Sequence, residues 1–114
     1  MKTTTAGRQA ETVVAEHLKN RGYKILAQNW KTTVCEIDLV TRRGEIVYFT
    51  EVKYRSGTAQ GEGFDYIGPQ KLKKMHFAAR IWVQSNNFDG DYRLLAASVS
   101  TDGLNYRLDE IVEL

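Results

Sequence analysis

The chain has 114 residues, a hydrophobic fraction of 42% and a formal net charge of +2, which predict one globular domain over residues 1–114 and exclude a disordered chain. Cys35 is the only cysteine, so neither an intrachain disulfide nor a thiolate zinc site can form. The first residues form no apolar signal segment, and no apolar run reaches the length of a membrane span. We therefore expect a cytoplasmic protein without a membrane partner.

Hydrophobic periodicity predicts a helix and then three strands in the first half of the chain. Apolar residues at spacings of three and four indicate a helix over Thr3–Arg21, with Gly22 as the residue that ends it. Strands are expected at Tyr23–Trp30, Val34–Thr41 and Glu45–Arg55, and the last two alternate in residue type along their length.

The second half of the chain begins with a glycine-rich stretch. Ser56–Gly68 contains four glycines and is expected to form a loop that can close over a ligand. A helix should begin at Pro69 and run to about Ser85. Strands are expected at Tyr92–Ser100 and Asn105–Leu108, and Asp109–Leu114 is expected to be a short tail or a final helical turn. The order helix-strand-strand-strand-helix-strand-strand predicts an α/β fold, a mixed sheet with flanking helices.

Four charged residues lie on the second and third predicted strands, and their relative positions depend on the turn between those strands. Glu36 and Asp38 share one face of the second strand, and Glu51 and Lys53 share one face of the third. A two-residue loop at Arg43–Gly44 would set Glu36 opposite Glu51. A four-residue loop would set Asp38 opposite Glu51. Either even loop gathers all four charges on one face of the sheet.

Carboxylates that converge from adjacent strands offer the oxygen ligands that Mg²⁺ and Mn²⁺ prefer. A bound cation would also remove the repulsion between them. A lysine two residues after one ligand lies on the same face, where it can orient a water or stabilise charge on a phosphoryl group. Cys35 alternates away from these carboxylates and is expected to be a small buried apolar residue. The pattern predicts a metal site for phosphodiester hydrolysis.

Asp38, Glu51 and Lys53 in this order resemble the active-site motif of the restriction-endonuclease-like, or PD-(D/E)xK, nucleases, although the proline of that motif is missing. Glu11 in the first helix resembles the extra helical acid of archaeal Holliday-junction resolvases of that group. The chain also resembles the YraN-like family of uncharacterised bacterial proteins, in which glycine usually stands at the position of Cys35. The segments that carry this second resemblance are Gly7, Ala10-Glu11, Gly22-Tyr23, Ile25-Leu26, Asn29-Trp30, Glu36–Leu39 and Phe49–Arg55.

The resemblance implies a restriction-endonuclease-like core and a Mg²⁺- or Mn²⁺-dependent endonuclease that acts on DNA. Asp38 and Glu51 would be the metal ligands and Lys53 the catalytic cation. Glu11 would be an auxiliary acid, although a surface position on the helix stays open for it, and Glu36 would support the site. Branched or damaged DNA is a candidate substrate, and RNA stays open as a partner.

Contacts to phosphate groups are expected from basic side chains, namely Arg42, Arg43, Arg55, Lys71 and Lys74. Two other functions stay open. One is a binding module that keeps the fold and holds nucleic acid without cutting it, and the other is an interaction protein whose surface carries these charges. A homodimer also stays open, since small nucleases of this kind often dimerise to cut two strands.

Overall fold

The computed structural model describes residues 5–56 and 67–114, and it confirms the predicted mixed α/β class. The start of the predicted first helix and residues 57–66 of the glycine-rich loop lie outside the described residues. In chain order the elements are α1 (Thr5–Lys19), β1 (Lys24–Lys31), β2 (Glu36–Arg43), β3 (Ile46–Ser56), α2 (Pro69–Ser85), β4 (Tyr92–Thr101) and β5 (Tyr106–Glu113).

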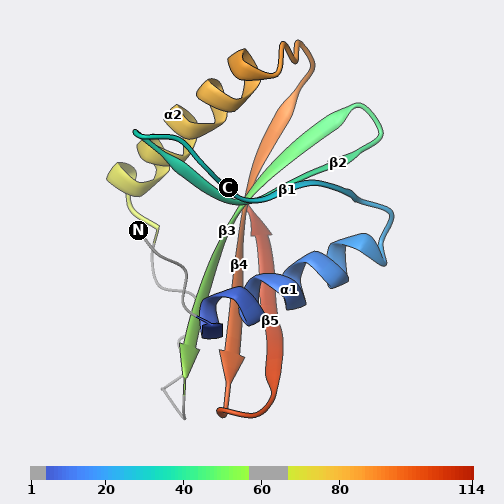
Figure 1. Cartoon of the computed structure of the whole chain (residues 1–114), viewed down its shortest axis with the longest axis vertical. Helices are drawn as coiled ribbons and strands as arrows, with labels where there is room; N and C mark the ends of the chain where they lie inside the picture. The colour runs from blue at the N-terminus through green and yellow to red at the C-terminus, as the bar shows by residue number, and fades with distance from the viewer. Residues whose placement is uncertain (1–4, 57–66) are drawn as a thin grey trace.

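The five strands form one mixed sheet in the order β1-β2-β3-β4-β5. The central strand, β3, pairs antiparallel with β2 and parallel with β4, and the remaining pairs are antiparallel. A parallel pair needs a long crossover connection, and α2 lies within the connection between β3 and β4. Figure 1 shows α1 and α2 on opposite sides of the sheet.

α1 ends at Lys19, two residues before the predicted end at Arg21, and α2 begins at Pro69 as predicted. Gly22 follows α1 with φ 90°, and the Tyr23 N–H donates to the Leu18 carbonyl at 3.0 Å while the Gly22 N–H donates to the Lys19 carbonyl at 3.1 Å. This is a Schellman ending, which favours glycine. α2 begins at Pro69, whose missing N–H costs nothing in a first turn. Neither helix in the described part of the chain is long and apolar enough to cross a membrane.

Two hydrophobic clusters fill the space between the sheet and the helices. On the α2 side, the rings of Phe49 and Trp82 meet edge to face with their centroids 5.5 Å apart. On the α1 side, Val14 packs with Leu39. The adjacent residues Leu39 and Val40 of β2 belong to different clusters, so the middle of β2 follows the alternation that the sequence predicts.

The hairpin between β2 and β3 has an even loop, as predicted, but the loop lies one residue later than expected. It consists of Gly44–Glu45, and Gly44 has φ 64°, a conformation that favours glycine at the first loop position. Leu39 pairs with Thr50, and the paired residues end there, one residue before Asp38 and Glu51. The two-residue loop therefore gives the register that the sequence analysis assigned to a four-residue loop.

The last strand is longer than the sequence analysis predicts. Residues 109–113 continue β5 and do not form a tail or a helical turn. Ile111 pairs with Ala97 of β4 and packs against the α1-side cluster. This burial holds the segment in the sheet, because leaving the apolar side chain in water would cost free energy.

Candidate functional site

β2 and β3 part at one end of their shared ladder, and Asp38 lies at that point. Their paired residues run from Arg43 and Ile46 to Leu39 and Thr50, while β3 goes on pairing with β4 as far as Ser56. Just past the last pair, the Val52 N–H donates to Asp38 Oδ2 at 2.8 Å. The Asp38 carboxylate thus accepts a backbone hydrogen bond in the gap between two strands.

The alternation of β2 breaks at the same place. Ile37 and Cys35 pack with the α2-side cluster, whereas Leu39 packs with the α1-side cluster. Cys35 therefore does not point away from the carboxylates as predicted. It is half-buried and lines a cleft together with Glu36 and Glu51. The local departure from a regular strand turns the Asp38 carboxylate toward β3 and brings Cys35 to the α2 side.

Four carboxylates influence one another electrostatically around this gap. The pKa of Asp38 is raised from 3.8 to about 7, chiefly by burial and next by the negative charge of Glu51. Glu11 and Glu36 also raise it, and the hydrogen bond from the Val52 N–H opposes the rise. Residues from α1, β2 and β3 therefore bring their negative charges together, as expected for Asp38 and Glu51.

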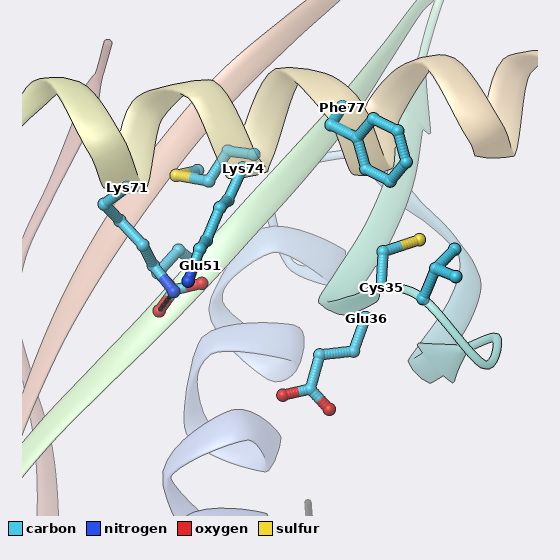
Figure 2. Close-up of a pocket in the computed structure, with 8 residues that line it drawn as sticks. Cys35, Glu36, Glu51, Lys71, Lys74 and Phe77 are labelled. Carbon is cyan, nitrogen blue, oxygen red and sulfur yellow. Dashed lines mark ion pairs between the residues drawn. The ribbon is translucent and has the colours of Figure 1, made fainter.

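Glu51 also has a positively charged neighbour on α2. Lys71 Nζ lies 3.1 Å from Glu51 Oε2, so this lysine, predicted to contact phosphate, is paired with a predicted metal ligand. Figure 2 shows Lys71 and Lys74 reaching from α2 toward Glu51 on β3. Both side chains of the ion pair retain solvent exposure, 45% for Lys71 and 22% for Glu51. An ion pair this exposed contributes little to stability, so another cation can displace it.

A cleft of about 300 Å³ lies next to Glu51, between α2 and the start of β2. Its lining residues are Val34, Cys35, Glu36, Glu51, Lys71, Lys74, Met75 and Phe77. A smaller recess of about 20 Å³ lies beside it and is lined in part by Glu36, Asp38 and Glu51. This volume is enough for about one water molecule. Within residues 5–56 and 67–114, no group of three or more His, Cys, Asp or Glu side chains is arranged to hold a metal ion.

Glu11 is buried in α1, with 6% of its surface exposed, and does not occupy the surface position that the sequence left open. Its Oε1 atom has no hydrogen-bond partner. Burial raises the pKa of Glu11. A hydrogen bond from the Asn29 side chain and the positive charge of Arg8 oppose that rise, and the charges of Glu36 and Glu51 add to it. A buried carboxylate oxygen without a partner is costly unless a proton or cation is supplied.

Asn29 is the residue of this site that sequence reasoning missed. It lies within β1 with φ 51°, a left-handed conformation that asparagine adopts more readily than most residues. Its side chain forms a hydrogen bond with Glu11. An asparagine inside an apolar strand segment was the available signal, because asparagine is uncommon in regular strands.

The remaining predicted residues separate into two places. Lys53 is half-buried on β3, two residues after Glu51, and pairs with Ser98 of β4, while Arg55 lies further along the same strand. Arg42 and Arg43 lie near the hairpin turn, about 13 Å and about 17 Å from Asp38 along β2. The Arg42 Nε–H donates to the Gly44 carbonyl at 3.0 Å, and the Arg43 guanidinium lies 4.5 Å from the Tyr23 ring centroid. These two arginines are outside the cleft.

Comparison with known proteins identifies a family over most of the chain. The family model described as "Uncharacterised protein family UPF0102" matches residues 10–111. A UPF0102 protein of Pseudomonas fluorescens (strain Pf0-1) is 42% identical over 79 residues, which cover 69% of this chain and 66% of that protein, just under two thirds of its length. A UPF0102 protein of Vibrio campbellii is 33% identical over 85% of this chain and 82% of its own length. One from Thermotoga maritima is 32% identical over 87% of this chain and 90% of its own length.

Proposed function

The chain belongs to the uncharacterised protein family UPF0102, the YraN-like proteins, and we propose that it is a divalent-metal-dependent nuclease that hydrolyses phosphodiester bonds in DNA. The observation that carries this proposal is the position of the Asp38 carboxylate. It is fixed by the Val52 N–H in the gap between β2 and β3, beside the negative charge of Glu51. The succession of elements and the parallel pairing of β3 with β4 support a restriction-endonuclease-like core.

The side chains around the gap are of the chemical type that a hard divalent cation takes as ligands. Asp38 and Glu51 present carboxylate oxygens, the ligand type that Mg²⁺ and Mn²⁺ prefer. The negative charges of Glu51, Glu11 and Glu36 raise the pKa of Asp38, and the buried Glu11 Oε1 has no hydrogen-bond partner. Asp38 and Glu51 would hold the ion, which when bound would supply positive charge for a phosphate oxygen and acidify a water.

The remaining roles fall to side chains of this chain. Lys53 follows Glu51 on the same face of β3, and its ammonium group would orient the attacking water or stabilise the charge that develops on the phosphate. Glu11, held by Asn29, would be the auxiliary acid. Glu36, which lines both the cleft and the recess, would support the site. We also propose DNA as the partner, a cytoplasmic location, and a homodimer for cutting both strands.

A second function is favoured by one contact. The Lys71 ammonium group lies 3.1 Å from Glu51 Oε2. It therefore occupies a carboxylate oxygen that a metal ion would need as a ligand. A non-catalytic module that keeps the nuclease fold would retain such a pair, and it would bind nucleic acid through Lys71, Lys74 and neighbouring basic residues.

Cleavage assays separate the two functions. Purified protein is incubated with Mn²⁺ and plasmid, single-stranded and four-way-junction DNA, beside the Asp38→Ala and Lys53→Ala variants. Lys73→Ala is the matched control, because Lys73 is exposed on α2 and does not line the cleft. A nuclease cuts at least one substrate, loses this activity in the first two variants and keeps it in the control. Nucleic-acid binding without cleavage by any of the proteins supports the module.

A further inference from the structure

The cleft beside Glu51 has an apolar end that the proposed chemistry does not use. Phe77 on α2 is 42% exposed and Val34, just before β2, is 65% exposed. Both line the cleft, together with Cys35 and Met75. Large apolar side chains left in water beside a cleft of about 300 Å³ are typical of a surface that a ligand covers.

The charged residues that line the cleft are Lys71, Lys74, Glu51 and Glu36. Lys71, Lys74 and Phe77 are spaced three residues apart on α2, so they follow one another along one side of the helix over about 9 Å. Lys71 is paired with Glu51, whereas Lys74 forms no ion pair with any residue that the structure describes. Figure 2 shows Glu51, Lys71 and Lys74 toward one end and Phe77 with Cys35 toward the other. Since Lys71 is paired with Glu51, Lys74 is the lysine that an anionic group of a ligand would meet. Phe77 and Val34 would meet an apolar face of the same ligand.

We propose that the cleft binds one unpaired nucleotide next to the scissile phosphodiester, with its base against Phe77 and its phosphate at Lys74. This inference rests on the proposed nuclease function for the identity of the neighbouring site. An aromatic side chain can stack on any base, but only where the base is not already stacked inside a duplex. The preferred substrate is then DNA with a single-stranded part, such as a flap, a gap or an opened junction.

Charge and size favour a nucleotide over other occupants. A purely apolar ligand would cover the Lys74 ammonium group without giving it a partner, which costs free energy. An intact duplex would offer phosphates to the lysines but no base face to Phe77. The volume of about 300 Å³ is at the lower end of small-ligand sites, which suits one nucleotide rather than a longer segment.

Binding is measured by fluorescence anisotropy with a fluorescein-labelled single-stranded oligonucleotide and with a duplex of the same length, in EDTA so that no strand is cut. We expect Phe77→Ala to weaken single-strand binding about tenfold, because stacking on one base typically has an effect of this order, and to leave duplex binding unchanged. Phe77→Trp should restore single-strand binding. Leu104→Ala, which removes an apolar side chain that is 87% exposed in the β4–β5 turn, is the matched control and should bind like the wild type.

The outcomes separate this subsite from the nuclease itself. Equal losses on single-stranded and duplex DNA, or unchanged single-strand binding by Phe77→Ala, overturn the subsite even if the wild type cuts DNA. A selective loss in Phe77→Ala with recovery in Phe77→Trp supports the subsite even if no cleavage is found. Because more than a third of Phe77 is already exposed to solvent, its truncation leaves the folded core in place. Recovery of binding in Phe77→Trp would show that the loss in Phe77→Ala comes from the missing ring and not from unfolding.

Discussion

Replacing Asp38 with asparagine removes one buried negative charge and keeps an oxygen that can accept the hydrogen bond from the Val52 N–H. The pKa of Asp38 is about 7 in the folded chain against an ordinary value of 3.8. Each unit of difference corresponds to 1.36 kcal/mol, so the ionised carboxylate destabilises the fold by about 4 kcal/mol. In the absence of divalent cations, Asp38→Asn should therefore be the more stable protein at alkaline pH.

The sign of the pH dependence follows from the direction of the shift. The folded state binds the Asp38 proton more tightly than the unfolded state, so wild-type stability falls as the pH rises between the two pKa values. Wild type and Asp38→Asn should have nearly equal unfolding free energies near the ordinary pKa of 3.8. The difference should grow as the pH approaches 7 and stay constant above it.

Urea unfolding in EDTA, followed by tryptophan fluorescence at a series of pH values, measures this difference. Glu51→Gln provides an internal check, because the Glu51 charge is the second cause of the raised Asp38 pKa, and its removal should make the wild-type pH dependence shallower. If Asp38→Asn is no more stable than the wild type above about pH 7, the carboxylate does not lie in the crowded, desolvated position described here.

Three further predictions test neighbouring contacts. Lys71→Met removes the cation paired with Glu51 and should tighten Mn²⁺ binding about two- to fivefold by calorimetry; unchanged or weaker binding would show that the pair does not compete with the ion. Asn29→Ala should unfold about 1 kcal/mol more easily than Asn29→Gly, because only glycine adopts φ 51° without a steric cost; equal unfolding free energies in urea would contradict this. Phe49 is 2% exposed in the α2-side cluster, so Phe49→Ala should lower the free energy of unfolding by about 3–5 kcal/mol. A decrease below about 1 kcal/mol in the same urea titration would place Phe49 outside the core.

Sequence patterns predicted those parts of the fold that depend on local chemistry. Gly22 ends α1 because the chain needs a positive φ there, and Pro69 begins α2 because its fixed φ suits a first turn. The strand pair was predicted with an even loop, yet its centre was placed one residue early, because Arg43 still belongs to β2. The β5 segment after Leu108 was missed, since its burial depends on contacts with α1 and β4 that the local sequence does not contain.

The candidate site was predicted in its residues but not in its arrangement. Periodicity gave Asp38 and Glu51 on neighbouring strands, but it treats a strand as regular and could not show that the ladder ends beside Asp38. Because periodicity assumes a regular strand, it also predicted that Cys35 points away from the carboxylates, whereas Cys35 lines the cleft with Glu36 and Glu51. Lys71 was predicted to contact phosphate, and its pairing with Glu51 depends on how α2 packs on the sheet. Asn29 was missed because its φ is set by tertiary contacts.

The central claim is that Asp38, Glu51 and Lys53 form a nuclease site, and one comparison tests it most directly. A fluorescently labelled flap or junction DNA is incubated with Mn²⁺ and with the wild type, Lys53→Met or Lys71→Met, and product strands are resolved on a denaturing gel. We expect the wild type and Lys71→Met to cut the DNA, because Lys71 only neutralises Glu51, and Lys53→Met to leave it intact. Cleavage by Lys53→Met at the wild-type rate, or intact DNA with all three proteins, would contradict the claim.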